Sequence, residues 1–144
     1  MNDSPDYHHV QYAMWLIGFV VLIALGLIHA AGAAMLIPFV IIGPIVAEFS
    51  VLTTSVRDDT IRWFFGLGFP GGSMSVFDCE RAEIVRTSLL EGWGIHLTPW
   101  HGWLWNASGF QAVELFRKGR TSVTLGTNDP QGLLVAIDGA RQGT

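Results

Sequence analysis

Side chains that could bind a metal ion are few in this chain and lie far apart. His8 and His9 are adjacent, and His96 and His101 are five residues apart, so in neither pair do the two rings fall on one face of a strand. No carboxylate stands beside them at the spacing that a zinc site uses. A single cysteine, Cys79, excludes an internal disulfide and any multi-cysteine metal site. The sequence therefore predicts neither a metal nor another cofactor.

Paired carboxylates could do acid–base chemistry, and one short cluster of them is present: Asp78, Glu80 and Glu83. The cluster alternates with Arg81 and Arg86, which is typical of an exposed strand edge. No nucleophile–base pair accompanies it, and Gly66-Leu67-Gly68 lacks the lysine and helix of a phosphate-binding loop. We therefore expect a protein that is not an enzyme.

Tryptophan is the residue type with the clearest functional signal. Four of the six tryptophans fall within residues 92–109: Trp93, Trp100, Trp103 and Trp105. Tryptophan contributes much of the binding energy at protein interfaces and also settles at membrane surfaces. We predict a partner interface here. The alternative is that some of these rings fill the hydrophobic core of the domain while the others cover its open end.

One dense basic cluster follows, formed by Arg117, Lys118 and Arg120. Near an anionic leaflet each cation could contribute about 1 kcal/mol of attraction, which makes the cluster a candidate lipid-surface site. A solvated hairpin turn explains the same residues.

The composition of the whole chain points to a membrane. Of its 144 residues, 50% are hydrophobic and 14% are charged, against about 25% charged in soluble domains. Mean hydropathy is +0.41 and the isoelectric point is about 5.6. A net charge of −4 argues against nucleic acid as a partner.

Most of the N-terminal third is uncharged, because residues 7–47 contain no Asp, Glu, Lys or Arg. This run is about twice the ~20 residues that one transmembrane helix needs. It predicts a hairpin of two helices, near residues 12–30 and 33–51, the second containing Pro38 and Pro44. Tyr12 and Trp15 would anchor it at the membrane interface. A cleaved signal peptide is the competing interpretation, opposed by the absence of Lys and Arg before the apolar run.

All eight Lys and Arg residues come after residue 56, so the positive-inside rule predicts that the C-terminal part lies in the cytoplasm. A hairpin then returns the N-terminus to the same side. We expect an N-terminal tail (1–11), a transmembrane hairpin (12–51) and a cytoplasmic domain (52–144).

The C-terminal domain has the pattern of a mainly β fold. Apolar and polar residues alternate around turns at Asp58-Asp59 and at 118–120, which predicts two hairpins. Further strands are expected within 73–87, around Ile95 and around Leu104. A helix begins near Asp129, a good N-cap, with Pro130 at its first position. About seven strands in a partial barrel, with the helix capping one end, are predicted.

The order of several short blocks resembles a bacterial family of membrane-anchored proteins with a pleckstrin-homology-like (PH-like) domain. The blocks are Arg62-Trp63, Phe69-Pro70, Gly92-Trp93-Gly94-Ile95, Gly102-Trp103, Ser108-Gly109, Ala112-Val113-Glu114-Leu115 and Gly126-Thr127. The resemblance covers nearly the whole chain and implies a PH-like fold in a bacterial inner membrane, with no assigned enzymatic activity or ligand. Loop 69–75 lacks the basic residues with which eukaryotic PH domains bind inositol lipids.

Two functions remain open from the sequence. In the first, the chain is an accessory subunit or scaffold of a larger membrane complex, of respiratory or photosynthetic type, and contacts other membrane subunits and the lipid bilayer. In the second, the domain senses the membrane surface or a small ligand through the basic turn and exposed tryptophans.

Overall fold

The computed structural model describes residues 6–142 of the chain. The elements follow in this order: β1 (Tyr7–Tyr12), α1 (Met14–Ala31), the 3₁₀ turn η1 (Ala33–Leu36), α2 (Ile37–Phe49), β2 (Val51–Arg57), β3 (Thr60–Phe65), β4 (Gly71–Ser75), the 3₁₀ turn η2 (Val76–Asp78), β5 (Cys79–Arg86), β6 (Gly94–Thr98), β7 (Gly102–Asn106), β8 (Gln111–Arg117), β9 (Arg120–Gly126) and α3 (Pro130–Gln142).

The strands form two sheets. The first sheet is antiparallel throughout, in the order β1-β2-β3-β4, and the second has the order β5-β8-β9-β7-β6. In the second sheet only β7 and β9 pair in parallel. The predicted turns at Asp58-Asp59 and 118–120 are confirmed, because β2 pairs with β3 and β8 with β9 in antiparallel register.

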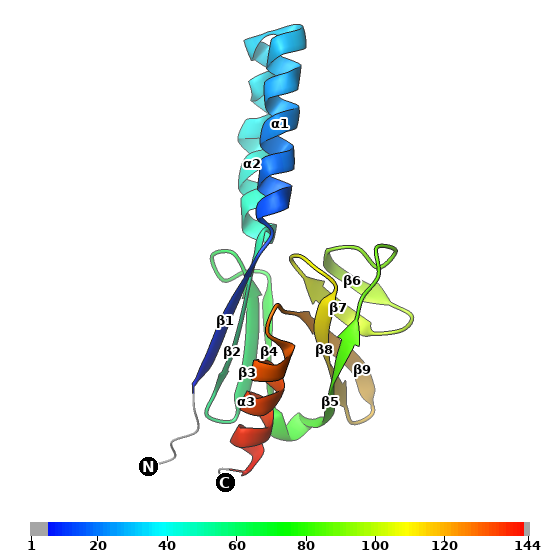
Figure 1. Ribbon diagram of the computed structural model, residues 1–144. Helices are drawn as coiled ribbons and strands as arrows, with labels where there is room; N and C mark the ends of the chain where they lie inside the picture. Colours follow the sequence, from blue (N-terminus) through cyan, green and yellow to red (C-terminus); the bar gives the residue numbers. More distant parts are fainter. Residues whose placement is uncertain (1–5, 143–144) are drawn as a thin grey trace.

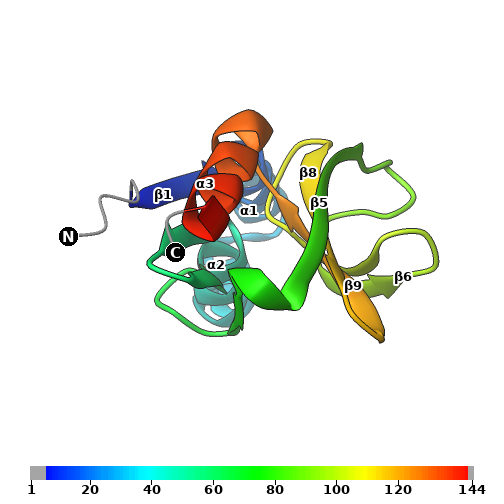
Figure 2. The same ribbon diagram turned by 90° about the horizontal axis from the view of Figure 1, so that it is seen from below.

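The main core lies between the two sheets and α3. It takes Ile61 and Trp63 from the first sheet and Val113 and Leu125 from the second, all almost fully buried. α3 contacts β1 and β2 of one sheet and β5 and β8 of the other (Figures 1 and 2). It begins as predicted, since the backbone N–H of Gly132 donates to Asp129 Oδ1 at 3.0 Å.

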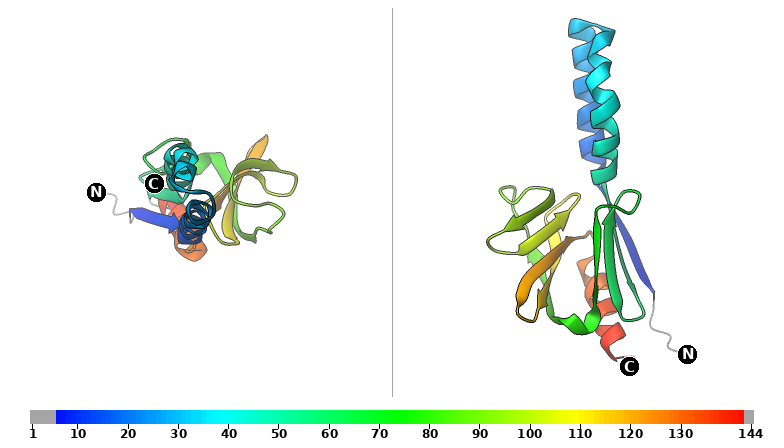
Figure 3. Two further views of the ribbon diagram at one scale, coloured as in Figure 1. Left: turned by 90° about the horizontal axis from the view of Figure 1, so that it is seen from above. Right: turned by 180° about the vertical axis from the view of Figure 1, so that it is seen from behind.

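The two apolar helices project clear of this domain, as seen from the front in Figure 1 and from behind in Figure 3. α1 has 18 residues, none of them buried, and at 1.5 Å per residue it is roughly 27 Å long. It is the one helix among residues 6–142 that is long and apolar enough to cross a membrane, a test that a signal sequence also passes. α2 is shorter, with 13 residues and Pro44 inside it.

Two expectations about the β domain are corrected. The described chain has nine strands in two sheets with no closed barrel, rather than about seven in a partial barrel. Residues 73–87 contribute the end of β4 and the whole of β5, with η2 between them.

The tail expected at 1–11 is also corrected, because Tyr7–Tyr12 forms strand β1 along the edge of the first sheet. Its inward-facing residues are Tyr7, His9 and Gln11, so the strand has no apolar alternation that would reveal it. Residues 1–5 lie outside the described part of the chain.

Candidate functional site at the helix-side end of the domain

The β1–β2 ladder runs directly into the helix pair, and this junction defines what we call the helix-side end of the domain. Tyr12 pairs with Val51 as the last rung of the ladder. One residue on each strand then leads into a helix, and the backbone N–H of Ala13 donates to the Ser50 carbonyl at 2.7 Å. Ala13 and Ser50 are fully buried. The helices therefore leave the sheet through a hydrogen-bonded junction with no linker.

The predicted interface anchors lie at this junction. Tyr12 and Trp15 are about half exposed. The Trp15 ring packs against Trp93 with 4.6 Å between centroids, and its indole N–H donates to Ser108 Oγ at 3.2 Å. Trp93 in turn donates to the Gly109 carbonyl. Two tryptophans predicted for different roles thus join the start of α1 to the second sheet.

Gln11 makes the same connection from inside. Only 1% of the residue is exposed. Its Nε2 donates to the carbonyl of Ser108 at 2.5 Å, and its Oε1 accepts the N–H of Ala107 at 3.2 Å. The side chain therefore ties β1 to the β7–β8 turn. Nothing in the local sequence indicated this residue, because its partners lie about a hundred positions away.

Two loops flank the helix base and carry exposed apolar side chains that sequence reasoning missed. In the β3–β4 loop, Leu67 and Phe69 are 99% and 82% exposed, and in the β5–β6 loop, Leu89 and Leu90 are 70% and 94% exposed. Figures 1 and 3 show both loops at the helix-side end. The loop compositions could have revealed them, since both place large apolar residues among glycines or beside a turn.

The β3–β4 loop is fixed to the end of α2. The N–H of Leu67 donates to Glu48 Oε1 at 3.0 Å, and the N–H of Gly66 donates to the Val51 carbonyl at 2.9 Å. Gly66 has φ +44°, and a Cβ there would lie 2.3 Å from the Glu48 carboxylate. Only glycine fits this position without moving Glu48.

The four clustered tryptophans divide into inward and outward groups. Trp105 packs on the core, 6.0 Å from Trp63 and 6.2 Å from Phe65 between ring centroids. Trp100 and Trp103, on the β6–β7 hairpin, are 70% and 43% exposed. Leu97 pairs with Trp103 and is 59% exposed as well. Trp93 is 37% exposed but packs against Trp15, so Trp100 and Trp103 are the two of the four that offer a free outward surface, together with Leu97.

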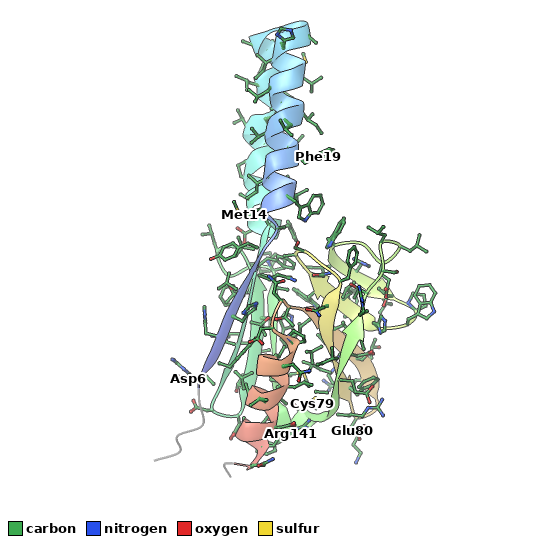
Figure 4. All side chains as sticks on the ribbon, viewed as in Figure 1. Asp6, Met14, Phe19, Cys79, Glu80 and Arg141 are labelled. Carbon is green, nitrogen blue, oxygen red and sulfur yellow. The ribbon has the colours of Figure 1, made fainter. Side chains whose placement is uncertain are left out.

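The basic turn lies at the opposite end of the domain, which we call the far end. Arg117 pairs with Cys79 across β8 and β5, and Figure 4 shows Cys79 and Glu80 at the end away from Met14 and α1. The Arg117 guanidinium donates to the carbonyl of Thr121 in its own hairpin at 2.8 Å. Lys118 and Arg120 line a groove with Asp78 and Glu80. The geometry therefore does not favour contact with a membrane that α1 enters.

A buried polar cluster is the most chemically distinct group in the domain. Nδ1 of His101 lies 3.0 Å from Glu114 Oε2, and Nε2 lies 3.7 Å from Glu91 Oε1. Ser122 donates to the other Glu114 oxygen at 2.6 Å. Both carboxylate side chains are only 5% exposed. One imidazole thus lies between two buried glutamates.

Sequence reasoning considered His101 only with His96, and the structure does not bring these two rings into contact. The missed signal is Glu114, a single charge within the apolar run Ala112–Phe116. Within residues 6–142 no group of three or more His, Cys, Asp or Glu side chains has the geometry to hold a metal ion.

Two further titratable groups are shielded by the core. Burial is the largest cause that raises the pKa of Tyr7 from 10.0 to about 12; a hydrogen bond with Thr127 opposes this shift and the charge of Asp129 adds to it. The Tyr7 hydroxyl donates to the Asp129 carbonyl at 3.3 Å. Burial likewise raises the pKa of the Cys79 thiol, against the nearby positive charge of Arg141. Both groups favour their neutral form in the fold.

Comparisons with protein-family models, with curated proteins and with solved structures found no match to this chain. The helix-side end and the exposed β6–β7 hairpin are therefore the features of the chain that bear on its function.

Proposed function

We propose that this chain is a two-pass, membrane-anchored binding protein without enzymatic activity, an accessory subunit of a larger membrane complex of respiratory or photosynthetic type. In this proposal α1 and η1–α2 cross the bacterial inner membrane as a hairpin. The β domain and the N-terminus both lie on the cytoplasmic side, where all the lysines and arginines are found.

The observation that supports two membrane crossings rather than one is the β1–β2 ladder. Tyr7–Tyr12 pairs with Val51–Val56 along its whole length, although α1 and α2 lie between the two strands in the chain. Paired strands must be on one side of a membrane, so the helices between them must make an even number of crossings. Removal of residues before position 33 as a signal peptide would also take β1 out of the sheet.

The helix surfaces support the same proposal. Apolar side chains on both helices are widely exposed, among them Leu22 at 69%, Val40 at 74% and Ile41 at 69%. Such surfaces are costly in water, at roughly 25 cal/mol per Å² of apolar area. η1 and α2 together form a shorter apolar helical segment, Ala33–Phe49, and their prolines are tolerated in membrane helices.

The β6–β7 hairpin supports the binding role. β6 is an edge strand of the second sheet, and Trp100, Trp103 and Leu97 are exposed on this hairpin. Exposed tryptophans of this kind are frequent hot spots in protein interfaces. The partner we propose is another membrane-protein subunit. The PH-like relationship remains part of the proposal, and two packed sheets with a C-terminal helix support it.

The test is purification of the tagged chain from its own membranes in a mild detergent. We expect partner subunits in stoichiometric amounts. Trp100→Ala combined with Trp103→Ala should weaken the association at least tenfold, because each hot-spot tryptophan contributes about 2 kcal/mol or more. A lone, monodisperse chain would argue against an accessory subunit.

The matched control is Phe77→Ala, which removes another exposed aromatic ring, 56% accessible, from η2 at the far end. It should keep the partners. If the double tryptophan variant keeps them equally well, the β6–β7 surface is not the interface.

A further inference from the structure

We propose that the β3–β4 and β5–β6 loops insert their apolar side chains into the interfacial layer of the same bilayer that holds α1 and α2. This inference rests on the membrane anchor proposed above and goes beyond it. It assigns a second, non-spanning lipid contact to the domain, made by Leu67, Phe69, Leu89 and Leu90.

The position of the loops follows from contacts already described. Leu67 is bonded to Glu48 in the last turn of α2, so the β3–β4 loop lies beside the exit of that helix. Trp93, at the end of the β5–β6 loop, packs on Trp15 in the first turn of α1. The loops lie on opposite sides of the helix base (Figures 1 and 3). If the helices enter a bilayer here, both loops meet its surface.

The charges at this end are turned into the protein. Residues 66–70 contain no charged side chain, and residues 87–93 contain one, Glu91. The Glu91 carboxylate accepts the N–H of Ser88 at 2.7 Å and is 5% exposed. Glu48, in the neighbouring turn of α2, accepts the N–H of Leu67. Glu91 is thus buried in the domain and the half-buried Glu48 accepts a backbone N–H of the loop, while the leucines are exposed.

This arrangement fits lipid better than protein. The four side chains project from two separate loops, with the helix base between them, rather than forming one continuous patch. Apolar and aromatic side chains of peripheral proteins enter a membrane about 5–10 Å deep in this way. The absence of Lys and Arg from both loops indicates an apolar contact that does not depend on anionic lipid.

The experiment uses the full chain reconstituted into vesicles of neutral phosphatidylcholine that contain a fraction of nitroxide-labelled lipid. In a Cys79→Ala background, Leu67→Cys or Leu90→Cys carries a polarity-sensitive fluorophore. Phe19→Cys carries the same fluorophore at a position on α1 that Figure 4 marks by name, and it reports helix insertion. Lys118→Cys reports the far end and is the matched negative control.

We expect labels at 67 and 90 to show a blue-shifted emission and a loss of fluorescence to the nitroxide lipid, as at 19, while the label at 118 shows neither. Quenching at 19 without quenching at 67 and 90 overturns the loop contact and leaves the anchor intact. The loops would then contact a protein partner, which these vesicles lack, rather than lipid. No quenching at 19 would overturn the anchor, and the loop contact with it.

Discussion

At the residue scale, His101 is the group on which two buried carboxylates depend. Glu114 has only His101 and Ser122 as side-chain partners within the described residues. Glu91 Oε1 lies 3.7 Å from the other nitrogen of the same ring, while its second oxygen accepts from Ser88. Removal of His101 leaves one oxygen of the buried Glu114 carboxylate without its hydrogen-bond partner, and an unsatisfied buried polar group costs about 1–3 kcal/mol.

We therefore expect His101→Ala to lower the free energy of unfolding by about 2 kcal/mol, the cost of leaving a buried polar group without its partner. Glu114→Gln in the same background should recover part of this loss, since a neutral amide costs less to bury. Chemical denaturation of the full chain in detergent measures both, with exposed His8→Ala as the control. Strictly additive losses would show that the two side chains are not coupled.

Tyr7 gives a pH dependence with a defined sign. Its pKa is raised to about 12 in the fold from 10.0, so the folded chain holds the phenolic proton more tightly than the unfolded chain. This contribution to stability is complete below pH 10 and is lost as the pH rises from 10 towards 12.

The expected result is that Tyr7→Phe loses less thermal stability than the wild type across this pH window, because the variant has no phenol to ionise at that position. Melting temperatures from pH 9 upward measure the difference. Tyr12→Phe removes the other tyrosine hydroxyl, which is exposed, and should follow the wild type. Parallel pH curves for Tyr7→Phe and the wild type would contradict the assignment.

At the element scale, Gln11 is the point where β1 is fixed to the second sheet. Gln11→Ala removes its hydrogen bonds to Ser108, Asn128 and Ala107 and leaves the Ala107 N–H without its partner inside the protein. A buried donor left unpaired costs about 1–3 kcal/mol. We expect the variant to lose that much unfolding free energy in detergent. Gln111→Ala, at an exposed position in β8, is the matched control and should change little.

The elements that could be predicted from the sequence are those with local signals. Turn residues at 58–59 and 118–120 and the Asp129 cap identify two hairpins and α3, and an uncharged run identifies the helices. β1 could not be predicted, because its inward-facing Gln11 and His9 look like residues of a polar tail. The Glu91–His101–Glu114 cluster was missed because its members come from two loops and a strand that only the tertiary fold brings together.

The candidate site also combines features that the sequence predicts with features that only the tertiary fold reveals. The clustering of tryptophans in 92–109 was visible in the sequence, but which of them point outward depends on how far the first sheet covers the second. Trp105 lies over Phe65 and Trp63, whereas Trp103, two residues earlier on the same face, extends beyond that cover. The position of the basic turn at the far end likewise follows from the length of β8 and β9.

At the scale of the whole molecule, the β1–β2 ladder makes a topological prediction. Reporter fusions at the N-terminus and at the C-terminus should both be found on the cytoplasmic side, because the ladder holds residues 7–12 against 51–56 and the basic residues favour that side. Active periplasmic reporter at one end alone would contradict the two-pass hairpin. Fusions to a chain lacking η1 and α2 provide a control for reporter function.

The junction at Ala13 and Ser50 has a mechanical consequence. One buried residue lies between each strand and its helix, and Trp15 packs against Trp93. No flexible linker therefore separates the α1–α2 hairpin from the two sheets. Transmembrane helices lean over when the hydrocarbon layer becomes thinner than their apolar length. If α1 and α2 span a membrane as we propose, any such tilt would turn the β domain as a rigid body, and bilayer thickness would then set the orientation of the β6–β7 hairpin relative to the membrane surface.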